Sequence, residues 1–241
     1  MKRVLVPCLD VPGALVSPGP DEAHHLIRVR RVAVGESVEL LDGLGGLALG
    51  EVAEVTKREL TIKVVRHLEQ DRESPLWLTL VAALPQQLST LDGVLPSLVQ
   101  QGLNRLILVP TEFGGSVKKD PGKYLDRLNS IALQALKQCG RVRVPSIELA
   151  ADLAGVIAGL ADEHQLVLML HPVPERLSQG LPARPESLAV LVGPEGGFSE
   201  AELALATAAG IVVRGLGPRI LKMETALAGI CFWAQDRFGD A

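Results

Sequence analysis

Short apolar runs, separated by stretches of helical character, repeat along the last two-thirds of the chain. Runs rich in Leu, Val and Ile predict strands at residues 76–84, 105–109, 165–170, 188–192 and 211–214. The clearest helix is expected at 124–138, where Asp120 is a candidate cap, Pro121 lies in the first turn and Gly140 ends the pattern. Alternating strands and helices predict an α/β fold, with a parallel sheet covered on both faces.

The first 70 residues have a different pattern. Strands are expected at 38–41, 47–55 and 60–65, with the glycine-containing turn 42–46 between the first two. Several short strands in such a segment predict a small closed or nearly closed β-barrel. Charged residues then give way to proline near residues 71–75. We therefore expect two domains, at residues 1–70 and 74–241.

Two glycine-containing turns lie near the end of the chain, each between a predicted strand and a helical run. The first is Gly193-Pro194-Glu195-Gly196-Gly197, and the second begins at Leu216-Gly217-Pro218-Arg219. Open α/β sheets bind ligands where parallel strands end, and glycine lets the backbone approach a ligand closely. Phe198-Ser199 follows the first turn, where a Walker phosphate loop needs Lys-Ser/Thr, and the dinucleotide motif Gly-x-Gly-x-x-Gly is absent. The turns predict a pocket made largely of main chain.

Helical signals follow each of these turns. Ser199 and Glu202 have the spacing of a capping box, which predicts that a helix begins just after Gly197. A last helix is expected at 224–238.

Composition and charge narrow the class of protein. The 241 residues are 47% apolar and 22% charged, as in ordinary globular proteins, and the net charge of −4 is unlike that of a strongly basic nucleic-acid binder. Basic residues nevertheless cluster at Arg28, Arg30 and Arg31. Three widely spaced cysteines suggest neither disulfides nor zinc, and no metal site is expected. Without a signal-peptide pattern or an apolar run of ~18 residues, a soluble cytoplasmic protein is expected.

Taken together, the two turns resemble the cofactor-binding motifs of SPOUT methyltransferases, in particular the RsmE-type 16S rRNA (uracil-N3)-methyltransferases. Further similarity lies at residues 3–6, 25–31, 71–76, 138–145, 170–172 and 237–240. The resemblance implies an N-terminal PUA-like RNA-binding barrel and a C-terminal domain tied in a trefoil knot. It also implies S-adenosylmethionine as cofactor, 16S rRNA of the small ribosomal subunit as substrate, and a homodimer. The last helix would lie partly at the dimer interface, with Ile230 and Trp233 buried there.

The implied reaction moves a methyl group to N3 of a uridine, which must lose its imide proton. Arg219 is the first candidate to stabilise charge on the uracil oxygens, although binding phosphate or pairing with a carboxylate would explain it equally well. Glu195 and Glu224 either accept the proton, hold Arg219, or favour a helix N-terminus. The expected cofactor-binding residues are Leu170, His171, Gly193, Gly196, Gly197, Leu216, Gly217, Leu221, Met223 and Thr225. The expected RNA-binding residues are Arg3, Arg28, Arg31 and Arg141.

The chain departs from the family pattern in one segment. Family members carry lysines and a glutamate on a helix that corresponds to residues 88–103, where this chain has Thr90, Ser97 and Gln100. Lys222-Met223 also replaces the more usual Arg-Thr or Arg-Ala. Two alternatives therefore stay open: a SPOUT methyltransferase with a shifted target, and a non-catalytic RNA-binding or ribosome-assembly protein.

Overall fold

The computed structural model describes residues 1–69, 72–117, 120–177, 179–181 and 184–241. Residues 70 and 71, at the expected domain boundary, and parts of the proline-rich segment 172–185 lie outside the described residues. The chain divides into two compact units. The first comprises residues 1–73 and 136–144, and the second comprises residues 74–135 and 145–241. The N-terminal unit therefore also takes in the end of a helix that begins in the other unit.

A five-stranded sheet forms the framework of the N-terminal unit. Its strands are β1 (Lys2–Leu5), β2 (Leu15–Val16), β3 (Ser37–Leu41), β4 (Leu47–Val55) and β5 (Leu60–His67). They lie in the order β1-β3-β4-β5-β2, with β1 parallel to β3 and the other pairs antiparallel. Within the described residues no pairing joins β1 to β2, so the sheet is not hydrogen-bonded into a closed ring. Buried Val, Leu and Ile side chains form its core.

Helix α1 (Pro20–Arg28) also belongs to this unit, where the sequence pattern predicted strands alone. Proline occupies the start of the helix, acidic residues lie in its first turn, and Ala23 and Leu26 are buried. The spacing of these two residues is that of a single helix face. The reading as strands was therefore incomplete.

The second unit contains a six-stranded sheet in which every recorded pair is parallel. Its strands are β6 (Trp77–Ala83), β7 (Arg105–Val109), β8 (Ser146–Leu149), β9 (Leu166–Leu170), β10 (Ser187–Val192) and β11 (Val212–Arg214). They lie in the order β11-β9-β10-β6-β7-β8, so the direction of the strand order reverses beside β10. A reversal of this kind opens a crevice at the carboxyl ends of the strands. The α/β fold with a parallel sheet is confirmed.

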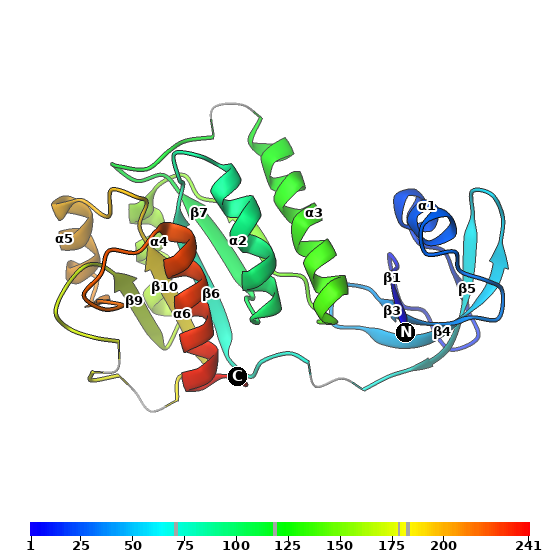
Figure 1. Ribbon diagram of the computed structural model, residues 1–241. Coiled ribbons are helices and arrows are strands. Elements are labelled where there is room, and N and C mark those ends of the chain that lie inside the picture. The colour runs from blue at the N-terminus through cyan, green and yellow to red at the C-terminus, as the bar shows by residue number, and fades with distance from the viewer. Residues whose placement is uncertain (70–71, 118–119, 178, 182–183) are drawn as a thin grey trace. The chain divides into compact units, whose positions relative to one another are not determined.

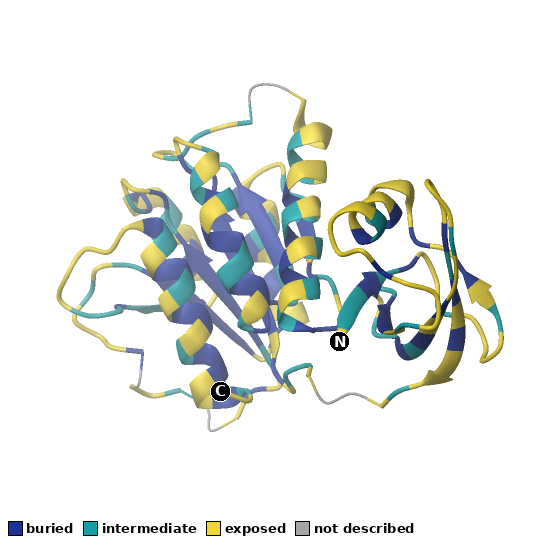
Figure 2. Ribbon diagram, turned by 45° about the vertical axis from the view of Figure 1, so that its right-hand side comes forward, coloured by how far each residue is buried: buried dark blue, intermediate teal, exposed yellow. Residues whose placement is uncertain are grey.

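Helices cover both faces of this sheet. The helices are α2 (Ser89–Gln100), α3 (Pro121–Cys139), α4 (Leu153–Glu163), α5 (Glu200–Ala208) and α6 (Met223–Phe238). Figure 1 shows α2, α3 and α6 in front of the strands and α4 behind them. Figure 2 shows that the strands between these helices are buried, while the outward faces of the helices are exposed. The apolar faces of both helix layers therefore meet the sheet.

The predicted helix signals are confirmed. The Asp120 carboxylate accepts the backbone N–H of Lys123 at the start of α3, and Gly140 follows the helix with a φ of +87°. Ser199 and Glu202 form the expected capping box of α5. Helix α2 forms although it contains Gly93 and Pro96. The buried residues of this helix repeat with helical spacing: Leu91, Val94, Leu95, Leu98 and Val99. Their packing therefore outweighs the low helix propensity of Gly93 and Pro96.

Candidate active site

A cavity of about 210 Å³ lies at the carboxyl edge of the parallel sheet. Three loops form it: those that follow β9, β10 and β11, the last of which leads into α6. The lining residues come from these loops and the first turn of α6: Leu170, His171, Pro172, Val192, Gly193, Pro194, Glu195, Gly196, Gly197, Leu216, Gly217, Arg219, Ile220, Leu221, Met223 and Ala226. Segments about 50 residues apart in the sequence thus share one pocket, because their strands are close in the sheet.

Glycine shapes the two turns in different ways. Gly197 and Gly217 have φ of +74° and +138°, which L side chains rarely adopt, and a Cβ on either would meet no atom within 4 Å. Gly193 is constrained by its own turn, since a Cβ there would lie 3.2 Å from the carbonyl carbon of Gly197. The backbone at Gly197 and Gly217 is therefore left open to a neighbouring molecule.

The loop after β9 closes against the turn after β11. The backbone N–H of His171 donates to the carbonyl of Arg214, and that of Gly215 donates to the carbonyl of Glu175. A Cβ on Gly215 would lie 2.4 Å from the Val173 carbonyl oxygen, so only glycine permits this approach. His171 Nδ1 is buried and has no hydrogen-bond partner among the described residues. At this point the cavity wall is therefore made of closely packed main chain from the two loops.

The candidate catalytic residues do not all reach the cavity. Arg219 and Glu195 line it and are solvent-exposed, and no ion pair joins them within the described residues. Glu224 and Thr225 are not among the lining residues, and Thr225 is exposed on α6. Nine of the ten expected cofactor-binding residues line the cavity, and Thr225 is the exception. The structure therefore brings together the two turns and His171, and it leaves Glu224 and Thr225 outside the cavity lining.

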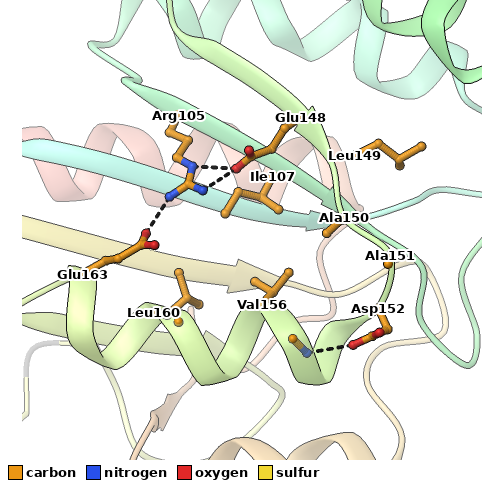
Figure 3. A pocket seen from close by; sticks show the side chains of 12 residues that line it. Arg105, Ile107, Glu148, Leu149, Ala150, Ala151, Asp152, Val156, Leu160 and Glu163 are labelled. Atoms are coloured by element: carbon orange, nitrogen blue, oxygen red, sulfur yellow. Dashed lines mark hydrogen bonds and ion pairs between the residues drawn. The ribbon is translucent and has the colours of Figure 1, made fainter.

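A second cavity, of about 280 Å³, lies between α4 and strands β7 and β8. Figure 3 shows Arg105 reaching across it to Glu148 and Glu163, both at 2.6 Å. These two carboxylates neutralise the charge of Arg105, which is the only basic side chain among the described lining residues. Neither glycine-containing turn lines this cavity, so the smaller cavity is the candidate active site.

The expected RNA-binding arginines separate into two pairs. Arg28 ends α1 and Arg31 follows three residues later; both are exposed, and neither side chain has a hydrogen bond or ion pair among the described residues. Arg3 donates to Glu39 and to the carbonyls of Lys137 and Gln138. Arg141 is 4% exposed and donates to the Glu73 carboxylate at 2.6 Å. Arg141 is therefore unsuited to contact RNA, because its guanidinium is buried in an ion pair.

Glu39 is the carboxylate that pairs with both Arg3 and Arg72 in the N-terminal unit. Burial by itself raises the pKa of its carboxyl, but hydrogen bonds from Arg3 and Arg72 outweigh burial, so its pKa lies below the ordinary value. Arg3 thus pairs with a carboxylate that stays ionised. Its position favours a structural role over an RNA contact.

Comparison with known proteins places this chain in a family. A family described as an RNA methyltransferase domain matches residues 72–235, and one described as an RNA methyltransferase PUA domain matches residues 18–65. The ribosomal RNA small subunit methyltransferase E of Mycobacterium tuberculosis is 32% identical over an alignment of 228 residues that covers 90% of this chain and 84% of that protein. The chain belongs to this RNA methyltransferase family.

Other relatives match most or all of the chain. The Bacillus subtilis ribosomal RNA small subunit methyltransferase E is 27% identical and aligns with 86% of this chain and 84% of its own. The crystal structure of a Neisseria gonorrhoeae ribosomal RNA small subunit methyltransferase E, bound to S-adenosyl methionine, has a TM-score of 0.91 and 26% identity, covering 100% of this chain and 99% of that one. The PUA-like domain and the methyltransferase domain expected from the sequence are both confirmed.

Two further observations concern membranes and metals. Among the described residues, no helix is long and apolar enough to cross a membrane. Nor do three or more His, Cys, Asp or Glu side chains in that part of the chain gather into a group able to hold a metal ion.

Sequence reasoning missed several residues of the site. Five lining residues were not among the expected site residues, although all lie within or beside the motifs: Pro172, Val192, Pro194, Ile220 and Ala226. Phe113 was also missed, and it packs against Gly196 of the first turn. It follows β7, more than 80 residues earlier in the chain, so no local pattern connects it with the site.

Proposed function

We propose that this protein transfers the methyl group of S-adenosylmethionine to N3 of a uridine in 16S rRNA of the small ribosomal subunit. The observation that carries the proposal is the cavity in which the loops after β9, β10 and β11 meet beside Arg219. The relatives named for ribosomal RNA small subunit methylation support the substrate, and the neighbour with bound S-adenosyl methionine supports the cofactor.

The residues of the cavity suit this cofactor. Gly197 and Gly217 leave main chain open, and Met223 and Leu216 add apolar surface. A phosphate-rich ligand fits less well, because no lysine follows Gly197. When bound, S-adenosylmethionine supplies a methyl group carried on a sulfonium. The loops hold it by backbone contacts, which fixes the direction of transfer and removes rotational freedom from the reaction.

Arg219 and Glu195 are the candidates for the chemistry on the uracil side. The Arg219 guanidinium has no partner among the described residues, so it is available to stabilise negative charge on the uracil oxygens as the imide proton leaves. Glu195, on the facing turn, either accepts that proton or orients Arg219. Glu224 stands outside the cavity lining, and its position in the first turn of α6 suits a favourable interaction with the helix dipole.

Three structural assignments complete the proposal. Residues 1–70 form the RNA-binding PUA-like domain, with Arg28 and Arg31 on its RNA-binding surface, and residues 74–241 form the methyltransferase domain. The second domain is knotted, with the C-terminal helix passed through a loop, an assignment supported by the insertion of β10 between β9 and β6. The protein acts as a homodimer through α6.

Ile230 does not belong to the proposed dimer surface. Ile230 is fully buried within its own chain, so it is unavailable to a partner. Phe232 on α6 is 58% exposed, and Thr225 and Gly229 lie on the same helix face at spacings of seven and three residues. This face, made of Thr225, Gly229 and Phe232, is the proposed dimer surface.

Methyl transfer from tritiated S-adenosylmethionine to small subunits that lack their uridine methylation tests the function, with mass analysis of the product nucleoside. Arg219→Ala should slow transfer about 10²–10³-fold, as loss of a charge-stabilising group does, and leave cofactor affinity nearly intact. Arg237→Ala, an exposed arginine at the far end of α6, is the matched control and should retain wild-type rates.

The same assay separates the alternatives. Wild-type protein that binds the subunit but transfers no methyl group would refute the enzyme and favour an assembly factor. Methyl on a carbon or on ribose would show a shifted target. Gly193→Val should abolish cofactor binding in calorimetry, because its side chain collides with the turn at Gly197. Undiminished binding by that variant would remove the pocket assignment.

A further inference from the structure

An aromatic side chain lies at the edge of the candidate active site. Phe113, in the loop after β7, is 46% exposed and packs against Gly196, which lines the cavity. A Cβ on Gly196 would lie 2.9 Å from Phe113 Cβ and 3.4 Å from the first carbon of its ring. Aromatic residues make up only 3% of the chain, so one exposed at this position calls for an explanation.

Two side chains hold the backbone around Phe113. The Gln86 amide, after β6, donates to the carbonyls of Phe113 and Gly114 at 3.3 and 3.0 Å. The N–H of Glu112 donates to Glu202 Oε1 at 2.9 Å, while the other oxygen of the same carboxylate completes the capping box of α5. These contacts fix the loop although it has no regular secondary structure.

Glycines bring the loop close to its neighbours. The N–H of Gly115 donates to the Leu84 carbonyl at 2.7 Å, and a Cβ on Gly115 would lie 2.2 Å from the Pro85 carbonyl oxygen. A Cβ on Gly114 would lie 2.5 Å from Thr111 Oγ1. The chain thus uses two consecutive glycines to seat the loop against the end of β6. An exposed ring on a rigid loop is preorganised for contact with a ligand.

We infer that Phe113 is the residue on which the target uracil stacks while its N3 faces the methyl donor. Proteins that act on single bases hold an unstacked base against aromatic side chains, and such stacking tolerates any base because every base has a π-face. Gly196 lies between Phe113 and the cavity, and it has no side chain. A base stacked on the Phe113 ring would therefore lie at the cavity mouth. This inference rests on the proposed methyl transfer to a uridine base.

Three variants test the role of the ring. Phe113→Leu keeps an apolar side chain against Gly196 but removes the π-face, whereas Phe113→Tyr and Phe113→Trp keep it. Trp77→Leu is the matched control, since Trp77 is a 50% exposed aromatic at the amino end of β6, the opposite end of the strand from the cavity. Cofactor binding by calorimetry should be unchanged in all four variants.

Single-turnover methyl transfer to small subunits lacking uridine methylation is then measured at saturating S-adenosylmethionine. Phe113→Leu should be about 10- to 100-fold slower at low subunit concentration, the loss expected when one stacked base loses its aromatic partner. The Tyr and Trp variants should stay within about threefold of wild type, and Trp77→Leu should match it. The fluorescence added by Phe113→Trp should fall when an rRNA fragment containing the target uridine binds, as it does when a base stacks on indole.

The outcomes distinguish the two proposals. If the wild type methylates the subunits and Phe113→Leu matches it, or if the Tyr variant is as slow as the Leu variant, stacking on Phe113 is wrong and the enzyme assignment stands. Undiminished fluorescence of Phe113→Trp in the bound complex also overturns the stacking. A wild type that transfers no methyl group overturns the enzyme assignment, and the role of Phe113 with it.

Discussion

Removal of the Glu73 carboxylate should strongly destabilise the N-terminal unit. One of its oxygens accepts hydrogen bonds from Nε and Nη2 of Arg141, at 3.1 and 2.6 Å. The other oxygen accepts hydrogen bonds from the backbone N–H groups of Val142 and Arg143, at 2.9 and 3.0 Å. The Arg141 and Glu73 side chains are only 5% and 13% exposed. Glu73 thus ties the segment 136–144 to the first part of the unit.

The expected loss follows from this burial. Breaking a buried ion pair by removing one partner costs roughly 3–5 kcal/mol, because the remaining charge stays in a low-dielectric site. Glu73→Ala also leaves two backbone N–H groups without their acceptor, which places it at the upper part of that range. Glu73→Gln keeps an acceptor oxygen and should lose less. Glu148→Ala removes an ion pair whose carboxylate is 45% exposed, and this control should cost under about 1 kcal/mol.

Urea denaturation followed by two signals measures the effect. Both tryptophans, Trp77 and Trp233, belong to the second unit, so their fluorescence reports that unit alone, whereas circular dichroism reports both. In Glu73→Ala the dichroism should show an early transition for the N-terminal unit, with the fluorescence midpoint shifted much less. The reasoning fails if Glu73→Ala unfolds within 1 kcal/mol of wild type, no more easily than Glu148→Ala.

Three further predictions concern pH, RNA and assembly. Burial lowers the pKa of His164 below 6.5, and its Nε2 lies 2.8 Å from Thr79 Oγ1. Because the unfolded state then binds the proton more readily, the free energy of unfolding should be constant above about pH 6.5 and fall below it. His164→Gln should flatten that dependence between pH 7.5 and 5.5, and an unchanged slope would contradict the burial argument. Replacing Arg28 and Arg31 with Ala should weaken RNA binding and lower its salt dependence by about 1–2 in log–log slope, without slowing transfer at saturating RNA; equal salt slopes would exclude both as phosphate contacts. Phe232→Asp should shift sedimentation from dimer to monomer, and a wild type that is monomeric at micromolar concentration while fully active would contradict the proposed dimer.

Local patterns in the sequence were enough to predict most of the second unit and the location of its site. Strand runs, the Ser199–Glu202 capping box and the two glycine turns depend on neighbours within a few residues, so they can be read without knowledge of the fold. Parallel strands also place their carboxyl ends at one edge, which is why both turns were expected in one pocket.

Tertiary structure decided which side chains are free to act. Arg28 and Arg141 are the same residue type and both lie near other arginines in the sequence, yet Arg28 is exposed and Arg141 is buried against a carboxylate 68 residues away. Ile230 and Phe232 are two apolar residues of one helix, and only the packing of α6 on the sheet makes the first core and the second surface. Phe113 follows β7 and Gly196 follows β10, and the two residues meet because only β6 separates these strands in the sheet. Burial and long-range contact depend on strand order and helix rotation, which a local pattern of apolar and polar residues does not encode.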